Sequence, residues 1–134
     1  MLDRIDLAQI EKMRTVQLPD GTSVVLRDII YTDCAAHCIT LHCKYGKSIS
    51  VRANFSEIEA LLCAYPYFFI PSKGIIVNFY EVAVQNADTF IMSDGCRIPI
   101  SRRKSKEVMD VYSSFLFEQL RKGAKNNAAR LQSY

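Results

Sequence analysis

The chain alternates hydrophobic and polar residues in short runs, and this pattern predicts a mainly β fold. Apolar residues occupy every second position over 38–43 and again at Ile49 and Val51, the period of a half-buried strand. Further short apolar runs, separated by turn residues, lie at 67–70, 75–77, 82–84, 89–92 and 96–100. Short strands about ten residues apart predict an antiparallel β architecture.

Local turn signals refine the first third of the chain. Pro19-Asp20-Gly21 separates the apolar runs 16–18 and 24–26, which predicts a first hairpin. A β run follows from Ile29 and ends at Thr32-Asp33, and the near-helical apolar spacing of the first ~14 residues predicts a short N-terminal helix.

Two more helices are predicted from their ends. Asn54 and Glu57 have the spacing of a capping box, and Tyr65-Pro66 should end this brief central helix. The last helix should be capped by Ser101 and closed by Gly123 in the left-handed conformation. The expected fold is thus mainly β and antiparallel, with one short central helix and a C-terminal helix.

Composition agrees with one globular domain. The 134 residues are 49% hydrophobic and 23% charged, with 5 Gly and 4 Pro, which excludes a disordered or collagen-like chain. No apolar run approaches the ~18 residues of a membrane span, and the first residues do not resemble a secretory signal. Five cysteines, an odd number, favour reduced thiols, so we expect a cytoplasmic protein with no membrane association.

The net charge of +3 matters less than its distribution. Between Cys34 and Lys106 there are nine basic and five acidic residues, and positions 102–106 hold four basic residues without an acid. Cations at a helix start oppose the helix dipole by roughly 0.3–1 kcal/mol each, so the cluster is unfavourable for stability alone. It fits either an anion site such as a nucleic-acid backbone or a solvated basic face.

Catalytic and metal chemistry have weak support. The sequence lacks glycine-rich phosphate loops and has no evident pair of catalytic carboxylates, so we predict no enzyme, no catalytic residue and no cofactor. A Cys/His group comprises Cys34, His37, Cys38, His42 and Cys43. Its spacing is not that of a structural zinc site, and we predict no metal ligands and mostly buried cysteines. A small cytosolic Cys/His metal or redox protein stays the alternative function, and a protein-interaction module that uses the basic face is a third.

The order of four segments carries a resemblance. They are Ile29 to Asp33 followed by His37, the capped stretch Phe55 to Leu61, Phe69 to Asn78, and Asp94 to Arg103, whose most specific part reads Gly-x-x-Ile-Pro-Ile-Ser-Arg-Arg. Together, over about residues 20–110, they resemble the LytTR-type DNA-binding domain of bacterial response regulators.

The resemblance implies an elongated antiparallel β-sheet sandwich of LytTR type. It also implies that loops, not a recognition helix, enter the major groove of double-stranded promoter DNA in a transcription regulator. By motif position it implies contacts from His37, from Ser72 and Lys73, and from Arg102 and Arg103, with Lys104 beside them. Family members commonly have His-Arg-Ser where this chain has Ser72-Lys73-Gly74, which leaves Lys73 as a phosphate contact. Arg102 or Arg103 is the better candidate for a bidentate guanine contact, and His37 for a base edge or phosphate.

The domain limits follow from these assignments. We expect a linker or helix over 1–16, the LytTR-like domain over 17–122 and a polar, flexible tail over 123–134. The resemblance further implies a receiver domain or sensor kinase acting upstream in a two-component system, and a homodimer on repeated half-sites.

Overall fold

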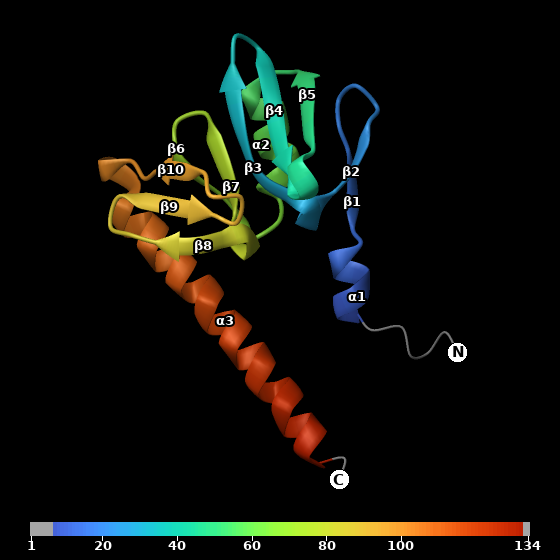
Figure 1. The fold of residues 1–134 in the computed structure, drawn as a ribbon, viewed down its shortest axis with the longest axis vertical. Helices are drawn as coiled ribbons and strands as arrows, with labels where there is room; N and C mark the ends of the chain where they lie inside the picture. The colour runs from blue at the N-terminus through green and yellow to red at the C-terminus, as the bar shows by residue number, and fades with distance from the viewer. Residues whose placement is uncertain (1–6, 133–134) are drawn as a thin grey trace.

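The computed structural model, which describes residues 7–132 and the side chains of 10–123, has ten strands in three antiparallel sheets (Figure 1). The largest sheet has the order β5-β4-β3-β7-β6. Its strands are β3 (Ile29–Ala35), β4 (Cys38–Cys43), β5 (Ser48–Arg52), β6 (Phe68–Ser72) and β7 (Ile75–Asn78). A second sheet, in the order β10-β9-β8, contains β8 (Val82–Gln85), β9 (Thr89–Met92) and β10 (Arg97–Pro99). The expected mainly β, antiparallel fold is confirmed.

The expected first hairpin is also present. It consists of β1 (Thr15–Gln17) and β2 (Ser23–Val25), paired in register through Val16 and Val24. The turn between them uses Gly21 at φ 91, a conformation that glycine adopts without steric cost.

Helices cover and extend the sheets. The α-helices are α1 (Leu7–Lys12), α2 (Phe55–Leu62) and α3 (Ser105–Gln132), and the 3-10 turns are η2 (Leu26–Asp28), η3 (Lys44–Gly46), η4 (Phe79–Glu81) and η5 (Arg102–Lys104). Helix α2 lies over one face of the five-stranded sheet, whereas α3 starts beside the three-stranded sheet and projects away from it (Figure 1).

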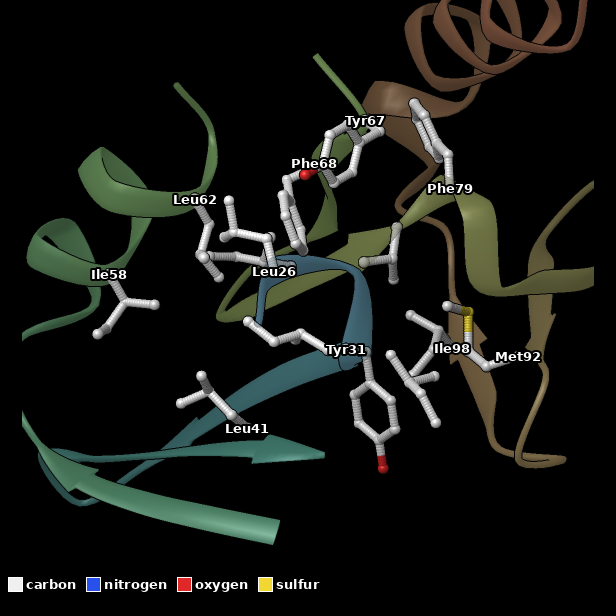
Figure 2. Close-up of a cluster of buried hydrophobic side chains, with 14 of the residues drawn as sticks. Leu26, Tyr31, Leu41, Ile58, Leu62, Tyr67, Phe68, Phe79, Met92 and Ile98 are labelled. Carbon is white, nitrogen blue, oxygen red and sulfur yellow. The ribbon is translucent and has the colours of Figure 1, made fainter. Parts of the chain in front are cut away.

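One continuous core joins these parts. Ile58 and Leu62 of α2 are fully buried with Leu26 and Leu41 (Figure 2). Phe79 connects this region to α3, since its ring lies 5.2 Å from that of Tyr112 and 6.2 Å from that of Phe90. The aromatic residues therefore fill the core, which fixes the positions of both sheets and of the first half of α3.

Three predictions about helix ends are wrong. Asn54 precedes α2 but its side chain makes no capping bond, because the Glu57 amide donates to the Asn54 backbone carbonyl instead, at 3.1 Å. Ser101 precedes the 3-10 turn η5, also without a side-chain cap. Helix α3 continues through Gly123 to Gln132, so Gly123 does not close it.

The expected N-terminal helix is present as α1 over Leu7–Lys12, so it ends slightly before the expected limit. Residues 1–6 of the expected helix lie outside the described residues. The flexibility expected for 123–134 stays a prediction.

Candidate nucleic-acid interface

Three loops from separate parts of the chain lie toward the same end of the five-stranded sheet, with the β3–β4 turn projecting furthest (Figure 1). The β3–β4 turn lies beside the β6–β7 turn, because β3 and β7 are neighbours with Asp33 opposite Ile75. The third loop, η5, joins at β6, where the Ser101 amide donates to the Pro71 carbonyl at 2.9 Å. We call the surface formed by residues 36–37, 73–74 and 101–104 the loop face.

The β3–β4 turn presents His37 at its tip. The two turn residues, Ala36 and His37, have φ values of 50 and 64, which is the left-handed region that hairpin turns of this length require. Asparagine and glycine normally fill such positions, and other residues cost about 1–2 kcal/mol each. The His37 carbonyl accepts from the Ala53 amide at 3.2 Å, which fixes the turn and leaves the side chain exposed.

The β6–β7 turn presents Lys73 and withdraws Ser72. The Ser72 hydroxyl is buried and has no hydrogen-bond partner among the described residues, whereas Lys73 is exposed. A register shift between Phe69 and Ser72 interrupts the alternation of β6 and accounts for this orientation. Gly74, at φ 79, turns the chain next to β3, where a methyl group on it would lie 3.9 Å from Cβ of Cys34.

The η5 turn carries the basic cluster. Arg102 and Arg103 are exposed, and neither forms an ion pair with any described residue. Lys104 is half-buried, and its Nζ donates to the Ile70 carbonyl at 3.4 Å. The three cations lie on a 3-10 turn before α3, not on the first turn of the helix as expected, and Lys104 anchors that turn to β6.

A groove brings most of these groups together. It has a volume of about 600 Å³, and its lining residues are Phe55, Glu59, Ile70, Lys73, Gly74, Ser101, Arg103 and Lys104. Three of them are cations and one, Glu59, is an acid, so the groove suits an anionic ligand. His37 and Arg102 lie outside the groove lining.

The sequence reasoning missed Arg52 as a candidate contact. Arg52 ends β5 opposite Cys38, the first residue after the β3–β4 turn, and its side chain is exposed. The pairing of β4 with β5 thus places a further cation next to His37. The one signal in the sequence is that Arg52 is among the nine basic residues that give residues 34–106 their positive net charge.

The Cys/His group is dispersed over the sheet. Cys43 is buried, Cys38 is half-buried and Cys34 is exposed, so the expectation that most cysteines are buried is wrong. His42 stacks on Tyr31 with 4.2 Å between ring centres, and its Nε2 lies 3.1 Å from Oδ2 of Asp33. Among the described residues, no three His, Cys, Asp or Glu side chains are grouped so that they could hold a metal ion.

Burial controls the titration of the groups behind the loop face. It raises the pKa of the Cys63 thiol to about 11, an effect that nearby Lys104 opposes. It also raises the pKa of Tyr31, whose hydroxyl accepts from the Cys96 thiol at 3.2 Å. These groups stay neutral near pH 7, so the loop face takes its charge from Lys and Arg.

Comparisons with known proteins agree with this geometry. The family model described as the LytTr DNA-binding domain matches residues 21–113. A solved structure with a similar fold is the LytTr DNA-binding domain of a protein described as a methyl-accepting/DNA response regulator from Bacillus cereus. It is 18% identical with a TM-score of 0.57, over 73% of this chain and 94% of that one.

No curated protein matches the chain. Across the part of the chain that the structure describes, no helix has the length and apolar character needed to cross a membrane.

Proposed function

The chain belongs to the family of LytTr DNA-binding domains, and from this premise we propose that its loop face reads a specific sequence in double-stranded promoter DNA. The observation that carries the proposal is that two loops distant in sequence, the β6–β7 turn and η5, bring Lys73 and Arg103 to one groove, with Arg102 exposed next to Arg103. Turns this narrow can enter a major groove about 12 Å wide.

The exposed side chains differ in what they offer DNA. Arg102 and Arg103 have forked guanidinium donors free of ion pairs with described residues, so we assign them to guanine edges. Lys73 supplies a point charge, and the newly identified Arg52 a guanidinium group, for phosphates. His37 contacts a base edge or a phosphate from the hairpin tip.

The remaining two predicted residues have mainly supporting roles. Lys104 donates one hydrogen bond to the Ile70 carbonyl, so it positions η5. It also contributes a weaker, sequence-independent attraction to phosphates. The Ser72 hydroxyl is buried, so DNA would reach it only if the turn moved.

The proposed biological role is that of the output domain of a bacterial response regulator. In this role the domain, residues 17–122, binds repeated half-sites as a homodimer in the cytoplasm and regulates transcription. It would be connected through residues 1–16 to a receiver domain in a two-component system. It needs no cofactor and catalyses no reaction.

The test begins with selection of a duplex from random-sequence DNA, followed by binding measurements at several salt concentrations. We expect the double change Arg102→Ala and Arg103→Ala to weaken binding to the selected duplex by about 1–3 kcal/mol per lost base contact. Arg102→Lys and Arg103→Lys keep the charge but lose the fork, and should relax sequence preference more than overall affinity.

A matched control lies at the opposite end of the sheet. Lys47 is exposed beyond η3, so Lys47→Ala removes one charge without touching the loop face. Lys73→Ala should lower the salt dependence of binding by about one counterion, whereas Lys47→Ala should not. Selection of no preferred sequence, or equal loss from both lysine changes, would contradict the proposal.

A further inference from the structure

A pocket separate from the loop face lies between helix α3, the turn η4 and the segment that leads into β6. It has a volume of about 290 Å³, and its apolar walls are formed by Pro66, Tyr67, Tyr80, Val111 and Phe115. A cavity of about 150 Å³ already holds a benzene molecule, so this pocket has room for one ring with a short substituent. An apolar pocket with a few polar groups is the usual form of a small-molecule site.

The aromatic walls of the pocket stand at steep angles to one another. Tyr67 and Tyr80 have ring centres 5.1 Å apart at an interplanar angle of 66°, and Tyr80 and Phe115 are 4.8 Å apart at 85°. The Tyr80 hydroxyl accepts from Nε2 of Gln119 at 3.2 Å, which holds this ring against α3. Walls at these angles offer a ligand ring both the edge and the face contacts that aromatic pairs prefer.

The unpaired charges around the pocket are positive. Glu118 is the one acid among the lining residues, and its Oε1 already pairs with Arg121 at 2.6 Å. Lys122 also lines the pocket, is exposed and forms no ion pair with any described residue. The Arg27 guanidinium lies 3.4 Å from the centre of the Tyr80 ring, again without an acidic partner in the described part of the chain. This balance favours an anionic head group and disfavours an ammonium group.

Tyr67 adds an unsatisfied donor to the wall. Its side chain is 4% exposed, and its hydroxyl has no hydrogen-bond partner among the described residues. Buried polar groups are nearly always paired, so an unpaired hydroxyl beside a pocket points to a polar atom that comes from outside the chain.

We propose that this pocket binds a small aromatic carboxylate, with the ring against the aromatic walls and the carboxylate at Lys122. The inference goes beyond the proposed function and does not rest on it, because none of the lining residues belongs to the loop face. A bound ligand would contact both α3 and the Tyr80 ring of η4, so it should stabilise the folded chain through linkage.

The test is a titration of the full chain with sodium phenylacetate, without DNA and at constant ionic strength, followed by amide chemical shifts in NMR spectra. We expect saturable shifts around the pocket with a Kd on the order of millimolar, as for other ligands of this size. Phenylacetamide keeps the ring without the charge, and hexanoate keeps the charge without the ring. Each should bind about threefold or more weakly than phenylacetate, and phenethylammonium should bind most weakly of all.

Two neighbouring serines give a matched pair of variants. Ser114 lines the pocket, whereas Ser113 does not, and both are exposed on α3. Ser114→Phe should obstruct the pocket and weaken phenylacetate binding by about tenfold or more, and Ser113→Phe should leave it unchanged. Lys122→Ala should abolish the preference for phenylacetate over phenylacetamide. Lys106→Ala removes an exposed lysine of the same helix outside the pocket and should preserve that preference.

The outcomes decide the inference independently of DNA binding. Absence of saturable shifts up to the solubility of phenylacetate, equal effects of the two serine changes, or a preference for phenethylammonium would overturn it. Hexanoate that binds as tightly as phenylacetate would overturn the assignment to an aromatic ligand. Circular dichroism without ligand verifies the fold of each variant, and Lys122→Ala keeps the test decisive if Ser114→Phe does not fold. Failure of the loop face to select a DNA sequence would refute the proposed function and leave this inference intact.

Discussion

Strand β7 begins beside Gly74 on the loop face and ends at Asn78 in the core, and different interactions fix its two ends. Asn78 is fully buried, with its Nδ2 donating to the Ile29 carbonyl at 2.9 Å and its Oδ1 accepting from the Tyr80 amide at 2.9 Å. At the other end, Lys73 is exposed and Gly74 adopts a left-handed conformation.

The difference shows that one short segment, Lys73 to Asn78, combines a constraint from stability with a constraint from ligand binding. Asn78 satisfies buried backbone groups, so its role is structural, whereas Lys73 has no described partner and is available to a ligand. Changes at the buried end should act on stability, whereas loss of an exposed side chain on the loop face should act on DNA binding; a change of backbone strain acts on stability at either end. The predictions below test this division, beginning with the largest effect.

Asn78→Ala should destabilise the protein by about 2–4 kcal/mol, because it leaves the buried Ile29 carbonyl and the half-buried Tyr80 amide without their side-chain partner. Urea unfolding followed by circular dichroism measures this loss. Asn86→Ala is the control: Asn86 is exposed, and its change should stay within about 0.5 kcal/mol. Equal midpoints for the two variants would show that the buried end is not held by Asn78.

Gly74→Ala should cost about 1–2 kcal/mol of stability, because a residue with a β-carbon is strained at φ 79. Its nearest neighbour would be 3.9 Å away, so the cost arises from the backbone and not from a clash. The matched change Gly123→Ala lies in a helix with open space around it and should stabilise by up to about 1 kcal/mol. Thermal melting of both variants should give shifts of opposite sign.

The sequence predicts the sheets better than the details of the loop face. Alternating positions such as Ile39 and Leu41, and turns such as Pro19-Asp20-Gly21, depend on local burial and backbone geometry, so their strands are confirmed. The three loops of the loop face, in contrast, are predicted only from the resemblance, through the order of the motif segments along the chain.

The features that sequence reasoning missed depend on tertiary context. The Ser72 hydroxyl is buried by a register shift in the pairing of β6 with β7. Arg52 lies beside the hairpin tip because β5 pairs with β4. Neither pairing can be read from the residues next to Ser72 or Arg52 in the sequence. The continuation of α3 through Gly123 shows that one glycine, which costs about 1 kcal/mol, does not end a helix whose neighbours favour it.

The hairpin tip should trade stability against binding. His37→Gly relieves a left-handed φ of 64 and should stabilise the protein by about 0.5–1 kcal/mol while it weakens DNA binding, since the imidazole is lost. Ala36→Gly relieves φ 50 in the same turn and should give similar stabilisation with unchanged DNA affinity. Melting temperatures together with binding isotherms separate the two; weakened binding by both variants would indicate that turn rigidity, and not the imidazole, matters.

The smallest expected effect concerns thiol reactivity, which distinguishes the two regions without any substitution. Cys34 is exposed next to Gly74, whereas burial raises the pKa of Cys43 and raises that of Cys63 to about 11. Because the thiolate is the nucleophile, Cys34 should react with iodoacetamide first at about pH 8, and Cys63 should become reactive only as the pH approaches 11. Peptide mass spectrometry follows each site. A saturating amount of selected duplex should slow alkylation of Cys34 and leave Cys63 unaffected; if Cys34 is not protected, the bound DNA does not cover the surface next to Gly74.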